Sequence, residues 1–170
     1  MRRKTLLLAG ILLLGWGCSE DSLQRFIPRT LAGLPLRETV TGGNAVSMIA
    51  EMHGKPVAPK ESAVAHYGEK SGTTATLYLS RYATAAAARS MLAEMSERIG
   101  GGGSVFRHHR KFEVNGRPVE MVLGLGQVHF FFAKDRILCW LAADVRHAAP
   151  ALAQLLEAEI GDIPFPVQAN

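Results

Sequence analysis

The stretch from Lys111 to Glu120, which reads KFEVNGRPVE, decides the fold class that the sequence predicts. Its central pair, Asn115-Gly116, is the dipeptide most typical of a two-residue type I′ turn, because both positions of that turn need a positive φ. Residues with β propensity on either side predict strands over 105–114 and 117–125. Counting outward from the turn places Lys111 opposite Glu120, and opposite charges stabilise a cross-strand pair. The centre of the chain is therefore predicted to be an antiparallel hairpin.

Helices and further strands are predicted on both sides of this hairpin. The segment 83–99 is the strongest helix prediction, because it is rich in alanine and spaces Ala88, Leu92 and Met95 by three or four residues into an apolar stripe. Altogether the sequence predicts helices over 44–53, 83–99 and 147–160 and strands over 62–67, 73–80, 105–114, 117–125, 127–133 and 136–143.

This order of elements predicts an α+β fold. We expect a two-layer sandwich, in which a mostly antiparallel sheet carries helices on one face, of ferredoxin-like or related kind. Two similar stretches, Leu77-Tyr78-Leu79 and Cys139-Trp140-Leu141, each precede an alanine-rich helix. This similarity suggests that a ββα unit is duplicated in the chain. The domain is predicted over 44–165, after a tether over 18–43 and before a short tail over 166–170.

Composition narrows the class of protein. The chain has 170 residues, of which 48% are hydrophobic and 20% charged, which is typical of one globular domain and excludes a disordered or multi-spanning membrane chain. Lys and Arg number 19 against 15 Asp and Glu, but Arg2, Arg3 and Lys4 open the chain, and without them the net charge falls from +4 to +1. A nearly neutral body lacks the positive field of a phosphate-backbone binder, so nucleic acid is not an expected partner.

The N-terminus has the pattern of an export signal. Arg2-Arg3-Lys4 precede an apolar run over 6–14, which is too short to span a bilayer. The following Leu14-Gly15-Trp16-Gly17-Cys18 resembles the lipobox of bacterial lipoproteins, in which a small residue precedes the cysteine that is lipidated and becomes the new N-terminus. Two alternatives are an ordinary signal peptide cut nearby with an incidental cysteine, and twin-arginine export through Arg2-Arg3.

The lipoprotein resemblance implies a location and a modification site. Residues 1–17 would be the signal peptide, and Cys18 would carry the acyl chains that anchor the protein to a membrane. Ser19 after the cysteine implies the outer membrane, with the body facing the periplasm or the cell surface. Cys139 would then be left without a disulfide partner, and its apolar neighbours predict a buried thiol that acts as a small hydrophobe; the alternative is a catalytic thiol.

The central hairpin places two polar residues on a predicted core face. In the expected register His108 and Arg110 share a face with Phe112, and burying them costs free energy unless they are paired or line a pocket. They are therefore a candidate ligand-binding site. The alternative is that they reach water at the sheet edge, or that a β-bulge turns them outward.

The last predicted hairpin is apolar on both faces. Phe130 and Phe132 lie on one face and His129, Phe131, Leu138 and Trp140 on the other. Helices on one side of the sheet would leave the second face open, so His129 and Trp140 are candidate binding residues for a protein partner, a second copy of the chain or a ligand. The alternative is a central strand that the first helix covers.

No metal or cofactor is predicted. The histidines have no metal-ligand spacing, and His108 and His109, as strand neighbours, point to opposite faces. We expect a membrane-anchored envelope lipoprotein that acts as a binding module through an open sheet face. The alternative is a small hydrolase or ligand-processing enzyme with a pocket around His108 and Arg110, and a weak metal or haem site built from scattered histidines is a third hypothesis.

Overall fold

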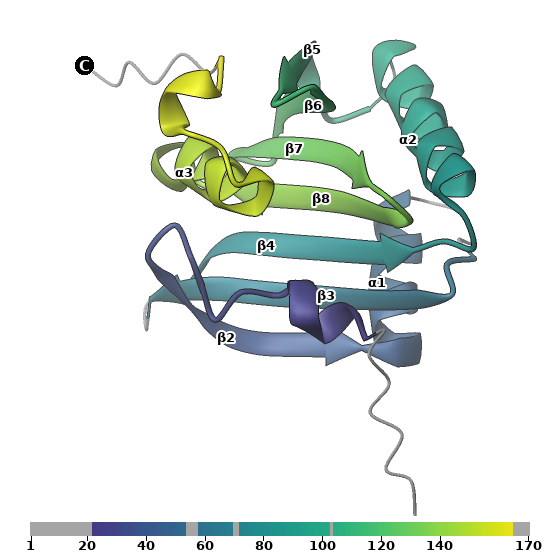
Figure 1. Cartoon of the computed structure of the whole chain (residues 1–170), viewed down its shortest axis with the longest axis horizontal. Coiled ribbons are helices and arrows are strands. Elements are labelled where there is room, and N and C mark those ends of the chain that lie inside the picture. Colours follow the sequence, from purple (N-terminus) through teal and green to yellow (C-terminus); the bar gives the residue numbers. More distant parts are fainter. Residues whose placement is uncertain (1–21, 54–57, 70–71, 103, 165–170) are drawn as a thin grey trace, which may run out of the picture.

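A computed structural model describes residues 22–53, 58–69, 72–102 and 104–164. In these residues one antiparallel sheet has the strand order β1-β2-β3-β4-β8-β7-β6-β5 (Figure 1). The strands are β1 (Thr30–Leu31), β2 (Leu34–Thr41), β3 (Glu61–Glu69), β4 (Gly72–Arg81), β5 (Arg107–Val114), β6 (Arg117–Gly124), β7 (Gln127–Lys134) and β8 (Ile137–Ala143). The helices are α1 (Gly42–His53), α2 (Ala85–Gly100) and α3 (Val145–Leu156), with short 3₁₀ helices η1 (Leu23–Phe26) and η2 (Ile160–Asp162).

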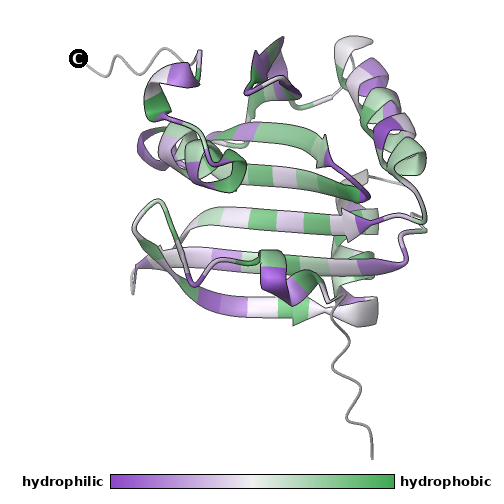
Figure 2. Cartoon of the chain, in the orientation of Figure 1, coloured by the Kyte–Doolittle hydropathy of each residue, from purple (hydrophilic) through white to green (hydrophobic). Residues whose placement is uncertain are grey.

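The α+β fold with an antiparallel sheet is confirmed, and the helices lie on both of its faces. Helices α1 and α2 pack on one face, whereas α3, η1 and β1 pack on the other, in front of the sheet in Figure 1. The arrangement predicted from the sequence had all helices on one face. The physical reason for the difference is that the central strands are apolar on both sides: Phe130, Phe131 and Phe132 are all fully buried, so each face needs a cover. Figure 2 shows this concentration of hydrophobic residues in β7 and β8.

The two stretches that echo each other in the sequence are direct neighbours at the middle of the sheet. Strand β4 pairs with β8 so that Leu77 lies opposite Leu141 and Tyr78 opposite Trp140. This pairing joins two antiparallel blocks, β2-β3-β4 and β5-β6-β7-β8. The helices after the two echoing strands, α2 and α3, nevertheless lie on opposite faces of the sheet.

The N-terminal segment belongs to the domain, which corrects the predicted boundary at residue 44. Leu23, Leu31 and Leu34 are buried in the larger core, and the Tyr67 hydroxyl donates a hydrogen bond to the Pro28 carbonyl (3.0 Å). The segment was interpreted as a tether because of its prolines and glycines, but its leucines cover the sheet. The predicted signal peptide, Cys18, Ser19 and the tail over 166–170 lie outside the described residues.

The register predicted from Asn115-Gly116 is confirmed along most of the central hairpin. Lys111 pairs with Glu120 and Arg110 with Met121, and Asn115 has the positive φ (51°) that the turn requires. A β-bulge then shifts the register, so that Arg107, and not His108, lies opposite Leu123. Within the described residues, none of the helices is both long enough and apolar enough to cross a membrane.

Candidate functional site

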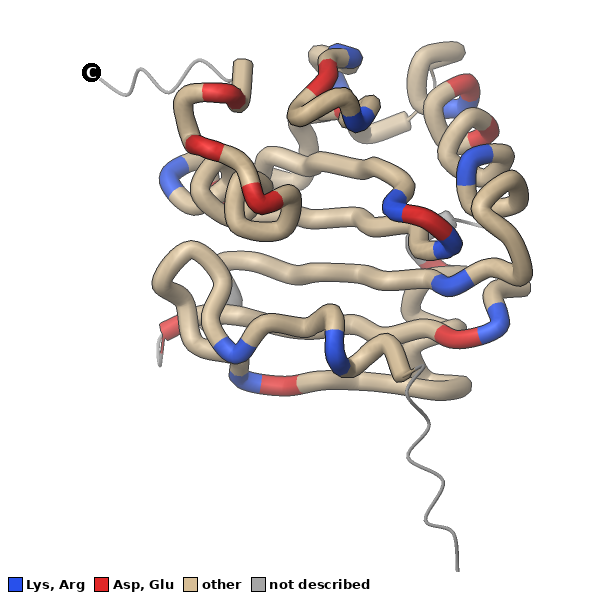
Figure 3. The backbone as a smooth tube through the Cα atoms, viewed as in Figure 1, with Lys and Arg blue, Asp and Glu red and all other residues tan. Residues whose placement is uncertain are grey.

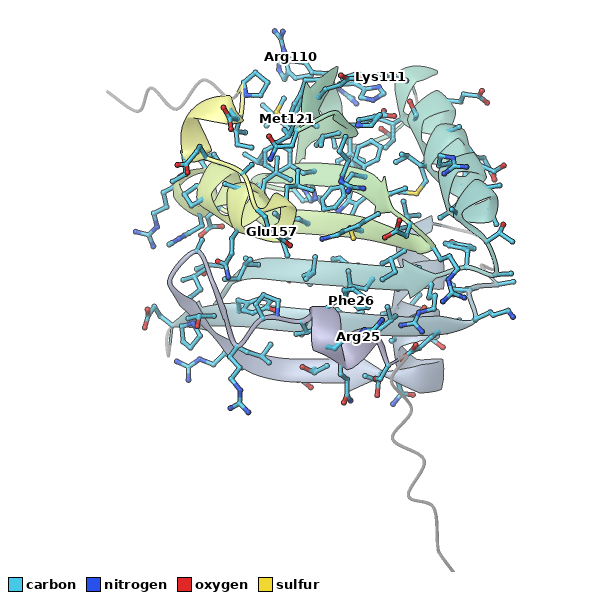
Figure 4. The ribbon with its side chains drawn as sticks, in the orientation of Figure 1. Arg25, Phe26, Arg110, Lys111, Met121 and Glu157 are labelled. Carbon is cyan, nitrogen blue, oxygen red and sulfur yellow. The ribbon has the colours of Figure 1, made fainter. Side chains whose placement is uncertain are left out.

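The structure places the predicted pair His108 and Arg110 in solvent. Both side chains are exposed on β5, an edge strand, and Figure 4 shows Arg110 projecting from the outer end of the molecule. His108 has a φ of 57°, which is the left-handed conformation of a bulged residue. The prediction that both residues are buried on the core face is therefore wrong. A β-bulge turns His108 outward, whereas Arg110 keeps its predicted register opposite Met121 and reaches solvent at the sheet edge, so each of the two alternatives applies to one residue.

His129 and Trp140 lie close together, as predicted, but in the interior. They are 3% and 5% exposed. The Trp140 indole N–H donates to His129 Nδ1 (3.1 Å), so His129 Nε2 carries the proton and donates to the Gly124 carbonyl (2.9 Å). Burial lowers the pKa of His129 below its usual 6.5. Both ring nitrogens are occupied, which is the arrangement of a structural core histidine.

The sheet face around His129 and Trp140 is closed. Ala88 and Met95 of α2 cover it, and the Phe106 ring lies 4.9 Å from His129 and 5.3 Å from Trp140. The prediction of an open sheet face around these two residues is therefore wrong, because α2 and Phe106 cover it. The alternative of a covered central strand is confirmed in part. The covering helix is α2, and not the first helix that this alternative named.

A second polar cluster lies beside this face. Glu120 is 7% exposed, and its two oxygens contact His109 Nε2 (2.5 Å) and Lys111 Nζ (3.7 Å). The predicted Lys111–Glu120 pair is therefore present, and His109 is the partner that the sequence did not reveal. The two contacts compensate the buried carboxylate, so the cluster has a structural role.

The other face of the sheet carries a groove that sequence reasoning missed. Its apolar part has a volume of about 240 Å³, between η1, α3 and the β7–β8 hairpin. Phe26 and Leu155 stand at its sides, and Leu79, Phe132 and Cys139 are among the strand residues that line it. In Figure 4, Phe26 and Glu157 lie on the same side of the sheet. Hydrophobic surface of this shape suits an apolar part of a ligand.

The groove continues into a basic part of about 150 Å³. Four basic side chains line it, and Asp135 is the acidic side chain among its lining residues: the basic ones are Arg25, Arg81, Lys134 and Arg136. The two parts share Arg25, Phe26, Lys134 and Ile137, so they lie next to each other. Figure 3 shows Lys and Arg gathered at this end of the sheet, around the β7–β8 turn and the end of β4.

Two side chains, each with two contacts, hold the walls of the groove in place. Glu61 accepts a hydrogen bond from the Leu23 N–H (2.9 Å) and pairs with Arg81 (3.5 Å), which fixes η1 against β4. Gln154 of α3 accepts from the Ala32 N–H (2.9 Å) and donates to the Thr30 carbonyl (2.7 Å), which fixes α3 against β1. The walls come from parts of the chain far apart in sequence, and these contacts make the groove a feature of the folded domain.

Cys139 lies on the floor of the groove as a buried free thiol. Burial raises its pKa to about 12. The thiol is therefore protonated at neutral pH, which does not suit a nucleophile and agrees with the prediction of a small hydrophobe.

Comparison with protein-family models, with curated proteins and with solved structures finds no match to this chain. Across the described ranges, no three side chains of His, Cys, Asp or Glu gather into a group that could hold a metal ion. The groove and the N-terminal pattern are therefore the features of the chain that bear on its function.

Proposed function

We propose that the chain is a lipid-anchored binding protein of the bacterial envelope, which holds its ligand in the groove between η1, α3 and the β7–β8 hairpin. The observation that carries the proposal is the groove itself, apolar along its floor and basic at one end. The lipid anchor at Cys18, the outer membrane and a position facing the periplasm or the cell surface are parts of this proposal, and they derive from the lipobox pattern.

The position of the groove along the chain supports combining these two parts. Ser22 is four residues after Cys18, and four extended residues span at most about 14 Å. Ser22 caps η1, whose Arg25 and Phe26 line the groove. An anchor at Cys18 would therefore hold the groove close to the membrane surface, with a tether much shorter than the one the sequence predicted.

The alternative enzyme function has less support. A hydrolase pocket around His108 and Arg110 requires both side chains to converge on a cavity, but both are exposed on an edge strand. The Cys139 thiol is buried and has a raised pKa. We therefore favour binding over catalysis.

The test compares the full-length chain, expressed in a bacterium, with its Cys18→Ala variant. We expect the intact mass of a chain that begins at Cys18 and carries acyl groups, and partition into the detergent phase; both should disappear in Cys18→Ala. Cys139→Ala is the matched control, because it removes the other cysteine and should leave lipidation unchanged. A soluble product without lipid, cut at another position, would contradict the anchor.

A further inference from the structure

We infer that the groove binds an anionic phospholipid of the membrane, with the phosphate in the basic part and the first segment of an acyl chain over the apolar floor. The inference rests on the proposed function, since it names the ligand of the same groove. The shape and the chemistry of the two neighbouring parts support this inference, because each part limits the kind of chemical group that can bind there.

The basic part fits a phosphate group. Arg81 reaches it from the end of β4, only 7% exposed, with its guanidinium already oriented by Glu61. Arg25 approaches from η1, Arg136 from the β7–β8 turn, and Lys134 from the same turn, where it also pairs with Glu157 of the groove (3.6 Å). Guanidinium groups bind phosphate oxygens through paired N–H donors, and their attraction to an anion is strengthened where water is partly excluded. A volume of about 150 Å³ holds the space of several waters, at roughly 30 Å³ each, which accommodates a phosphate.

The apolar part fits a hydrocarbon segment but not a whole drug-sized molecule. Its volume of about 240 Å³ is below the roughly 300 Å³ at which small-molecule sites begin. Phe132, Leu79 and Leu155 contribute apolar surface, and the polar side chains that also line this part are Arg25, Lys134, Gln154 and Glu157. A ligand that fills both parts must therefore be amphiphilic, with its anionic group next to its apolar end and the rest of the molecule outside the protein.

The position of the groove favours a membrane lipid as the source of this amphiphile. Arg25 and Phe26 lie in η1, which begins five residues after Cys18. With Cys18 in the bilayer, the basic part lies near the layer of lipid phosphates, where a high local concentration of headgroups compensates for a small contact area.

The experiment places a fluorescent reporter at the side of the groove. The full chain with Phe26→Trp, lipidated, is reconstituted into phosphatidylcholine vesicles that contain a minority of brominated phosphatidylglycerol or, in a parallel sample, brominated phosphatidylcholine. Bromine on the acyl chains quenches an indole in contact with them. Trp140 lies on the opposite face of the sheet under α2, so the wild-type chain reports the background.

We expect brominated phosphatidylglycerol to quench the introduced indole more strongly than brominated phosphatidylcholine does, with Trp140 affected equally by both. Arg136→Gln and Lys134→Gln should each lower this preference about fivefold, the contribution of one basic side chain near an anionic surface. Arg89→Gln is the matched control, because Arg89 is an exposed arginine on α2, on the other face of the sheet. Leu155→Trp at the other side of the groove provides a second reporter if Phe26→Trp unfolds the protein.

The outcomes separate this inference from the anchor. Equal quenching by both lipids would overturn the anionic preference, and no quenching of the reporter in a chain whose mass shows lipid on Cys18 would overturn occupancy of the groove. If Cys18 carries no lipid, the same variants are titrated in solution with dodecyl phosphate and with inorganic phosphate. Binding of dodecyl phosphate alone would support the ligand without the anchor, and saturation by inorganic phosphate alone would show a small-anion site and overturn the inference.

Discussion

Trp140 and Gly124 hold His129 in one protonation state from two sides of the ring. The indole N–H occupies Nδ1 and the carbonyl accepts from Nε2, so a second proton has no acceptor in the folded protein. Burial is the main cause of the lowered pKa. In the unfolded chain the same imidazole titrates near 6.5. The unfolded state therefore binds the proton first as the pH falls, and acid destabilises the fold.

This linkage gives a prediction for pH dependence. His129 contributes stability that is complete above a pH of about 6.5 and is lost as the pH falls from there toward the lower pKa of the folded state. His129→Gln keeps a donor and an acceptor but does not titrate, so its free energy of unfolding in urea should decline less on acidification than that of the wild type. His108→Gln, at an exposed histidine, is the control and should follow the wild type. Parallel curves for wild type and His129→Gln would contradict the assignment.

At the scale of single elements, the β5–β6 hairpin shows what local sequence can and cannot predict. The Asn115-Gly116 turn and the Lys111–Glu120 pair are encoded by neighbours in the chain, and the register beside them was predicted correctly. The bulge at His108 is not encoded in this way. It brings Phe106 to the face where His129 and Trp140 lie, and that contact depends on strands β7 and β8 being in place. The alternation of apolar and polar residues along one strand does not reveal a bulge that depends on packing against distant strands.

The contact between Phe106 and β6 gives a second prediction. A Cβ at Gly124 would lie 2.5 Å from the Phe106 ring, so Gly124→Ala must displace that ring and should destabilise the fold by about 1–3 kcal/mol in urea unfolding. Gly161→Ala is the matched control, because nothing lies within 4 Å of its added Cβ. Adding Phe106→Leu to Gly124→Ala should restore part of the loss. An unchanged unfolding midpoint in Gly124→Ala would show that Phe106 is not packed against β6.

At the scale of the whole molecule, the groove was missed because its parts are distant in sequence. One wall is η1, which lies in the segment that was interpreted as a tether because of its composition. The other wall is α3. Leu23 and Leu31 were the available signal, since isolated leucines in a proline-containing segment can dock on a sheet. The α+β class, by contrast, could be predicted, because hairpin turns and helical stripes are local patterns.

Because the N-terminal segment is part of the core, shortening one of its buried side chains should lower the stability of the fold strongly. Leu31 is fully buried, so Leu31→Ala should lower the free energy of unfolding by about 2–5 kcal/mol. Leu125→Ala is the control: that leucine is 74% exposed, and its loss should change stability little. The measurement is urea unfolding followed by circular dichroism. If the two variants unfolded at the same midpoint, residues 22–34 would be a tether after all.

The pairing of β4 with β8 also determines the order in which the chain can fold. Leu77 meets Leu141 only after the last strand has been made, so the contact that joins the two halves has one of the longest loop closures in the sheet. Until then, β4 presents an unpaired edge of hydrogen-bonding groups, which is a template for strands of other molecules. A chain that leaves the ribosome from its N-terminus must keep this edge protected until β8 is made, and a chain truncated before residue 137 is expected to aggregate through it.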